Sequence, residues 1–266
     1  MAKPKKNTQA WAITYADMVT LLLTFFVLLL VILSEAEKQL DIEISRLLDK
    51  AQVQIETALD DKNIDVERVK KGVKITIRGK LFKQLSPDIS PQYISKIAKI
   101  GELIKETDLM KINPSIIPDS SDKHFNLLNE LDNRDKELAI EIRCEGHTDD
   151  AIIPKDKRTK YKTNWQLSTE RSLNVVNLMN KYASMPLKYF SALGYGPHRP
   201  LISIETIKGK KTRKEKDRLR EYNRRVEIYL DAFSRDKIRT DEEELIQTLS
   251  GKKQTKQKEV TIEETS

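Results

Sequence analysis

The hydrophobic pattern divides the chain into unlike parts, and the first is a long apolar run over residues 11–33. It contains twelve Leu, Ile or Val residues, and Asp17 is its only charged residue. As a helix the run would be about 35 Å long, enough to cross a hydrocarbon core of about 30 Å. A secretory signal peptide is the alternative, but the run is too long and no small-x-small cleavage pattern follows Leu33. The pattern therefore predicts a retained transmembrane helix.

A second pattern, with apolar residues at steps of three and four, occupies residues 34–62. No Pro or Gly interrupts the stretch from Glu35 to Leu59. The recurring apolar positions are Leu40, Ile44, Leu47, Ala51, Ile55 and Ala58. This spacing predicts an amphipathic helix, which could simply link the span to the following domain.

Residues 63–233 alternate between strand-like and helix-like patterns. Period-two alternation predicts strands at 73–77, 138–144, 189–193 and 226–230, and helical spacing predicts helices at 91–106 and 166–182. The helices should bury Ile94, Ile97 and Ile104, and Leu173, Val176 and Met179. The order βαβαββ predicts an α+β domain, a mixed sheet with helices on one face.

Two segments do not fit this pattern. Residues 107–137 form an unusually long connection, so we expect an insertion with its own structure or a mobile flap, with a short helix around His124–Leu131. Residues 234–266 are charged and poor in core residues, so we expect a disordered tail.

The charge balance matters more by position than by total. The chain has 266 residues with 48 Lys+Arg and 41 Asp+Glu, a net charge of +7. Ten Lys/Arg and three Asp/Glu fall within residues 208–225, so this stretch alone carries +7. We expect a basic loop at 208–222, a solvated, mobile loop or helix extension before the last strand, with contact to an anionic wall polymer or lipid headgroups as the alternative. Together with the membrane span, this distribution argues against a nucleic-acid partner.

The basic residues before the span also predict its orientation. Lys3, Lys5 and Lys6 precede it, whereas Glu35 and Glu37 follow it. By the positive-inside rule, residues 1–10 stay in the cytoplasm and everything after the span is exported.

Asp17 needs an explanation, because a carboxylate at the centre of a membrane helix costs about 2.5–3.5 kcal/mol and somewhat less near an end. On a helix, Thr14, Asp17, Thr20 and Thr24 fall within an arc of about 120°. The threonines could merely bond back to their own helix, and Asp17 could reach the headgroups. Four polar groups on one stripe favour a face turned away from lipid, with Asp17 carrying an ion.

The segment WAITYADMVTLLLTFFVLLLVI resembles the span of MotB-type flagellar stator subunits, through Tyr15, Ala16, Asp17 and Thr20. The resemblance implies that Asp17 binds the translocated ion in a channel shared with MotA-type subunits, with Tyr15, Thr20 and Thr24 facing that channel. It implies a plug role for residues 34–62, a bacterial inner-membrane location and a homodimer. Protons are favoured over sodium.

A second set of motifs lies in the domain: GHTD at 146–149, N-x-x-LS-x-x-R at 164–171, GYG at 194–196 and NRRVE at 223–227. Together they resemble the OmpA-like peptidoglycan-binding domain over about residues 64–233. The resemblance implies that Asp149 and Arg171 grip the diaminopimelate of the peptide stem, with Asn164 and Thr148 beside them. An Asp and an Arg held close together suit the ammonium and carboxylate of a zwitterionic ligand end.

Enzyme chemistry is not indicated. His147, Asp149 and Ser168 suggest a triad, but no nucleophile elbow, P-loop or paired-His motif accompanies them. A single Cys excludes a disulfide framework, and we expect Cys144 to be buried. We therefore predict no catalytic residue, no metal and no cofactor other than the ion.

Smaller roles follow from the same motifs. We expect His147 to orient its loop, Asn223 to tie a loop, and Arg225 to face solvent or the ligand groove. Tyr195 and the neighbouring glycines should form a tight turn. Two functions remain: an ion-conducting stator subunit anchored to peptidoglycan, or a purely structural OmpA-like tether whose span is only an anchor.

Overall fold

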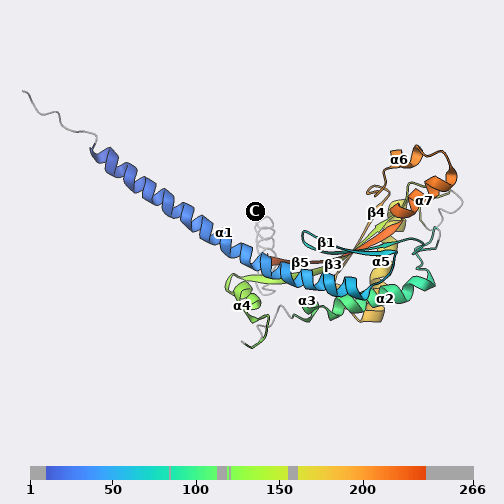
Figure 1. Cartoon of the computed structure of the whole chain (residues 1–266), viewed down its shortest axis with the longest axis horizontal. Helices are drawn as coiled ribbons and strands as arrows, with labels where there is room; N and C mark the ends of the chain where they lie inside the picture. Colours follow the sequence, from blue (N-terminus) through green and yellow to red (C-terminus); the bar gives the residue numbers. More distant parts are fainter. Residues whose placement is uncertain (1–9, 84, 113–118, 120, 155–160, 238–266) are drawn as a thin grey trace, which may run out of the picture.

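The chain begins, within the described residues, with one long helix, α1 (Ala10–Ala58), of 49 residues. The computed structural model describes residues 10–83, 85–112, 119, 121–154 and 161–237. One helical segment in this part of the chain, Trp11–Ile32, is long and apolar enough to cross a membrane, and none of it is buried. Figure 1 shows the N-terminal half of α1 extending away from the domain, whereas its C-terminal half lies along it. The expected basic segment 1–10 lies almost wholly outside the described residues.

The C-terminal half of α1 belongs to the core of the domain. Its apolar face is buried with the sheet and the other helices at Leu40, Ile44, Leu47, Leu48, Ala51 and Ile55. This half contacts β1, β2 and β5 and the helices α2, α3 and α4. The amphipathic pattern is thus satisfied within the chain itself, by packing against a sheet.

Five strands form a single mixed sheet in the order β1-β2-β5-β3-β4. The strands are β1 (Ile64–Val69), β2 (Gly72–Arg78), β3 (Lys136–His147), β4 (Phe190–Gly196) and β5 (Arg225–Asp236). β3 and β4 pair in parallel, and the other neighbours pair antiparallel. The mixed α+β sheet is confirmed. The predicted βαβαββ order was wrong in omitting β1, an edge strand whose side chains are only partly buried, so its alternation is weak.

The main helices cover one face of this sheet. α2 (Pro91–Glu106) and α5 (Asn164–Ala183) pack against each other, and α5 lies on β3 and β4. Ile97, Ile104, Val176 and Met179 are buried as expected, whereas Ile94 is only partly buried. Leu173 was predicted to be buried but is 41% exposed, because Val175, Val176 and Met179 define the inward face instead.

The long connection before β3 has its own structure where it is described. It contains α3 (Asp108–Lys111) and α4 (Phe125–Asn133). Leu109, Leu127, Leu128 and Leu131 are buried in the main core. This favours an insertion with its own structure over a flap for these parts, while residues 113–118 and 120 lie outside the described residues.

The basic segment 208–222, expected as a loop or a helix extension, is mostly helical. After η2 (Leu187–Tyr189) and β4, the chain forms α6 (Ile204–Lys208) and then α7 (Arg213–Asn223). Thr212 and Glu215 form a capping box at the start of α7, which explains why so charged a segment folds as a helix. The tail prediction also began too early, since β5 continues to Asp236; residues 238–266 are not described.

Candidate functional site

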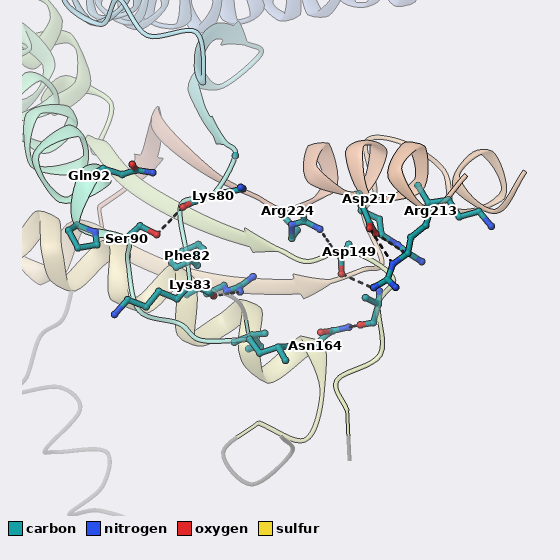
Figure 2. A pocket seen from close by; sticks show the side chains of 18 of the residues that line it. Lys80, Phe82, Lys83, Ser90, Gln92, Asp149, Asn164, Arg213, Asp217 and Arg224 are labelled. Atoms are coloured by element: carbon teal, nitrogen blue, oxygen red, sulfur yellow. Dashed lines mark hydrogen bonds and ion pairs between the residues drawn. The ribbon is translucent and has the colours of Figure 1, made fainter. Parts of the chain in front are cut away.

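A groove with a volume of about 1440 Å³ lies beside the C-terminal end of β3. Figure 2 shows the loop of residues 79–92 on one side and α7 on the other. The loop contributes Lys80, Phe82 and Lys83, the start of α2 contributes Gln92, and α7 with its flanks contributes Lys211, Arg213, Lys216, Asp217, Arg220 and Arg224. Asp149, Asn164 and Arg171, predicted from widely separated motifs, all line this groove.

Asp149 follows the end of β3 and is fixed from two sides. Its Oδ1 accepts a hydrogen bond from the backbone N–H of Ala151 at 3.1 Å, which closes a tight turn. Its Oδ2 accepts one from Arg224 Nη1 at 2.6 Å. The carboxylate is thus held in the groove by a local turn and by a cation 75 residues away in sequence.

Arg171 reaches the groove from α5 and is 6% exposed. Its Nε donates to the carbonyl of Ser86 at 3.2 Å, and its guanidinium lies over the ring of Phe82 at 4.8 Å. Burial lowers the pKa of Arg171 to about 10, while the nearby charge of Asp149 acts in the opposite direction. At neutral pH the side chain is a rigidly held, poorly hydrated cation, which suits it to binding a carboxylate.

Asn164 lines the groove, whereas Thr148 does not. Asn164 is the first residue of α5 and donates from Nδ2 to the carbonyl of Ala151 at 2.8 Å, so it ties the Asp149 turn to the helix. Thr148 is 4% exposed and is absent from the groove lining. The structure therefore does not support a groove contact by Thr148, because its side chain is directed into the protein.

Glycines let α5 lie close to the sheet at this point. A Cβ on Gly146 would lie 2.1 Å from the carbonyl oxygen of Ser168, and one on Gly194 would lie 2.3 Å from the amide nitrogen of Thr169. Gly196 has φ of +54° and ends β4. The expected tight turn therefore describes Gly196, whereas Gly194 is a strand residue needed for close packing.

The sequence identified the wrong arginine of the NRRVE motif. Arg225 was expected to face solvent or the groove, but it is buried and donates to Glu227 Oε1 at 2.6 Å. Its neighbour Arg224 lines the groove instead. Asn223 does tie a loop, exchanging two hydrogen bonds of 2.9 Å with the backbone of Ile202.

A second anchor for α7 was also missed. Arg220 binds Asp150 through two hydrogen bonds of 2.7 and 3.0 Å. The Arg220 hydrogen bond holds the pKa of Asp150 below its usual value. The sequence did contain a signal for these ion pairs. Asp149 and Asp150 are adjacent after β3, and Arg220 and Arg224 are four residues apart, the spacing of one helix face. The two ion pairs fix α7 against the end of β3.

A buried polar cluster of Glu145, His147 and Glu227 lies on the face of the sheet that is turned away from α5. Their ligand atoms lie within 4.8 Å of one another, so by distance alone they could hold a metal ion. Both nitrogens of His147 lack a hydrogen-bond partner among the described residues. Burial lowers the pKa of His147 to about 4 and raises that of Cys144, also fully buried, to about 12. The absence of a metal stays a prediction.

The membrane span presents Asp17 on an unburied helix. Thr14, Thr20 and Thr24 donate to the carbonyls three residues before them, at 2.8–2.9 Å. These hydroxyls are thus satisfied by their own helix, as one alternative predicted. The carboxylate of Asp17 has no hydrogen-bond or ion partner in the described part of the chain. Tyr15 is 64% exposed on the same span.

Comparison with known proteins extends these observations. Residues 1–49 match the family described as membrane MotB of the proton-channel complex MotA/MotB. Motility protein B of Bacillus subtilis is 26% identical over 86% of this chain and 96% of its own length, and the uncharacterized protein YtxE of the same organism is 24% identical over 86% and 90%.

Solved structures align over most of the domain at low identity. A putative MotB-like protein from Desulfovibrio vulgaris has a TM-score of 0.48 and 17% identity, covering 73% of this chain and 94% of its own. The periplasmic domain of Helicobacter pylori MotB has a TM-score of 0.42 and 18% identity, covering 71% and 91%.

Taken together, the described residues form one helix that is long and apolar enough to span a membrane, followed by an α+β domain with a groove beside the end of β3. The family match at residues 1–49 and the relative aligned over 86% of the chain support a more particular conclusion. Over most of its length the chain is similar to Motility protein B, and its first 49 residues are similar to the membrane segment of the MotB family.

Proposed function

We propose that this protein is a flagellar stator subunit that conducts protons with a MotA-type partner and anchors the complex to peptidoglycan. The observation that carries the proposal is Asp17, the only charged residue of an unburied span, within the segment that matches the MotB family. An unpartnered carboxylate at that depth is costly, so a partner protein or a wet path has to supply its surroundings.

Asp17 would work as a proton site whose charge changes with occupancy. A proton entering from the outer side neutralises the carboxylate, and its release to the cytoplasm restores the charge. That change alters the electrostatic fit between Asp17 and the partner and so biases the partner's conformation. Each proton crossing 100 mV supplies about 2.3 kcal/mol. The description of the matching family as a proton-channel complex supports protons over sodium.

The groove would hold the peptide stem of peptidoglycan. Asp149 offers a carboxylate for the ammonium of a diaminopimelate end, and Arg171 offers a guanidinium for its carboxylate. Both residues line the groove. Anchoring prevents the stator from turning with the rotor, so that conformational work appears as torque. We further propose a homodimer, an outward-facing domain and a cytoplasmic N-terminus.

The decisive experiment replaces Asp17 in a motile strain. Asp17→Asn removes the titratable proton with little change of shape, so we expect normal membrane assembly and co-purification of a four-span partner, but no swimming and no proton flux. Asp41→Asn, an exposed acid of α1 beyond the span, is the matched control and should swim normally. A swimming Asp17→Asn strain would favour the structural tether. Motility that survives a protonophore but stops without sodium would show that the translocated ion is sodium and not a proton.

A further inference from the structure

One wall of the groove is a row of cations. Arg213, Lys216, Arg220 and Arg224 line it at intervals of three or four residues, and Lys211 lines it just before α7 begins. This spacing places the side chains on one face of the helix. From Arg213 to Arg224 the row is about 16 Å long by helical rise. It therefore extends beyond the space that a single amino-acid end beside Asp149 would occupy.

Only part of this row is neutralised. Arg224 is paired with Asp149 and Arg220 with Asp150. Arg213 lies 3.7 Å from Asp217 with its side chain 95% exposed, a pair that contributes little. Lys211 and Lys216 have no ion partner within the described residues, and neither has Lys80 or Lys83 across the groove. The groove lining has eight Lys or Arg side chains and two Asp side chains, Asp149 and Asp217, so positive charge remains in excess on both sides of the groove.

The two parts of the groove suit different chemistry. Asp149 and Arg171 together complement a ligand end that carries one positive and one negative charge. The outer part of the row, where Lys211 and Lys216 have no acidic partner among the described residues and Arg213 has only an exposed one, instead complements a chain that repeats negative charge without positive charge. Lysine ammonium groups bind phosphate as point charges and do not need a fixed planar geometry.

We propose that α7 binds a phosphodiester polymer attached to the cell wall, alongside the peptide stem in the same groove. This inference rests on the proposed peptidoglycan contact of that groove. The polymer lies along Lys211, Arg213 and Lys216, and its phosphates also approach Lys80 and Lys83. Because the contacts are exposed, their strength falls as salt screens them.

The test uses the full chain in detergent and measures co-sedimentation with purified Gram-positive walls. Half of the walls are treated with hydrofluoric acid, which cleaves phosphodiester polymers and leaves peptidoglycan. The test variant combines Lys211→Gln, Arg213→Gln and Lys216→Gln. The matched control combines Lys210→Gln, Lys214→Gln and Arg218→Gln, which removes the same charge from exposed positions outside the groove lining.

On intact walls we expect the test variant to bind about tenfold more weakly than the wild type, from three lost surface ion pairs. The control should bind like the wild type, and the difference should shrink at high salt. On stripped walls all three proteins should bind equally. Equal binding of test and control variants to intact walls overturns the proposal, and so does a loss that appears equally on stripped walls or is reproduced by anionic phospholipid vesicles.

Failure of the peptidoglycan contact would look different. In that case stripped walls would retain none of the proteins, and Asp149→Asn would change nothing on any wall. Charge-dependent binding to intact walls by wild type and control, but not by the test variant, would then still uphold the polymer site on its own.

Discussion

Asp149 pairs with its neighbour Arg224 in the groove lining at 2.6 Å, whereas Arg171 donates to the backbone of the loop that contains Lys83 and Ser86. The two groups proposed to hold a zwitterion are therefore each held by the protein, and not by each other. A ligand ammonium has to compete with Arg224 for Asp149. Removing the charge of Asp149 should consequently affect one end of the ligand only.

We predict that Asp149→Asn weakens binding of stem-peptide fragments about tenfold or more, because a hydrogen bond between charged groups is lost. Fragments whose side-chain amine is acetylated should bind wild type and variant alike. Glu102→Gln, an exposed acid on α2, serves as the control. Calorimetric titration gives the affinities. Equal weakening for acetylated and free fragments would show that Asp149 acts by shaping the loop instead.

The packing of α1 gives a second prediction. Ile44 is 3% exposed in the main core, whereas Ile42, two residues earlier, is 42% exposed. Ile44→Ala should lower the free energy of unfolding by about 2–5 kcal/mol, through lost burial and the cavity left behind. Ile42→Ala should change it by less than about 1 kcal/mol. Denaturant titration of the full chain in detergent measures both. Similar small effects would mean that α1 does not pack on the domain.

A third prediction concerns the approach of α5 to β3. In Gly146→Ala, the new methyl group would lie 2.1 Å from a backbone oxygen, so the helix would have to move. We expect a loss of about 1–3 kcal/mol or more. Gly209→Ala is the control, since its nearest neighbour would lie at 3.5 Å, an ordinary contact. Thermal unfolding compares the two variants, and equal melting temperatures would contradict the observed packing.

Acid should destabilise the domain through His147. Burial lowers the pKa of this side chain to about 4, with Arg225 and Arg199 acting in the same direction and Glu227 opposing them. An unfolded His binds a proton below a pH of about 6.5, so the unfolded state gains protons first as the pH falls. Stability is therefore lost between about pH 6.5 and pH 4, by at most about 3 kcal/mol.

His147→Gln should remove much of this pH dependence. Burial raises the pKa of Glu145, which reduces stability as the pH rises and so partly offsets the histidine effect. The comparison of variant with wild type isolates His147 from Glu145 and from His124, whose pKa burial also lowers. Unfolding measured at pH 7 and pH 5 provides the test. An unchanged slope in the variant would assign the acid sensitivity elsewhere.

The sequence was sufficient for the features that depend on local periodicity or motif spacing. The limits of α2 were predicted to the residue, and Asp149, Asn164 and Arg171 do share a groove. Properties that depend on contacts between residues far apart in the sequence could not be predicted from it. Arg224 and Arg225 are adjacent, and only the end of α7 and the register of β5 determine which of them reaches the groove.

The surface that covers the apolar face of α1 could not be predicted from the sequence either. Its amphipathic period predicts a buried face but not the surface that covers it, because a membrane channel and a sheet both present apolar side chains. The helical fold of residues 213–223 was likewise hidden by their charge, since the capping box and the ion pairs to Asp149 and Asp150 stabilise it without an apolar stripe.

Because α1 runs without interruption from the span into the core, it also limits how far the domain can reach from the membrane. Among the residues of α1 whose side chains the structure describes, Leu40 is the first that is buried, and it lies eight residues beyond Ile32, the end of the apolar span. Eight residues of helix measure about 12 Å. Each turn of α1 that leaves the sheet would extend this tether by about 5.4 Å, at the cost of exposing buried leucine and isoleucine. The packing energy of one helix face therefore determines the distance between the apolar span and the groove.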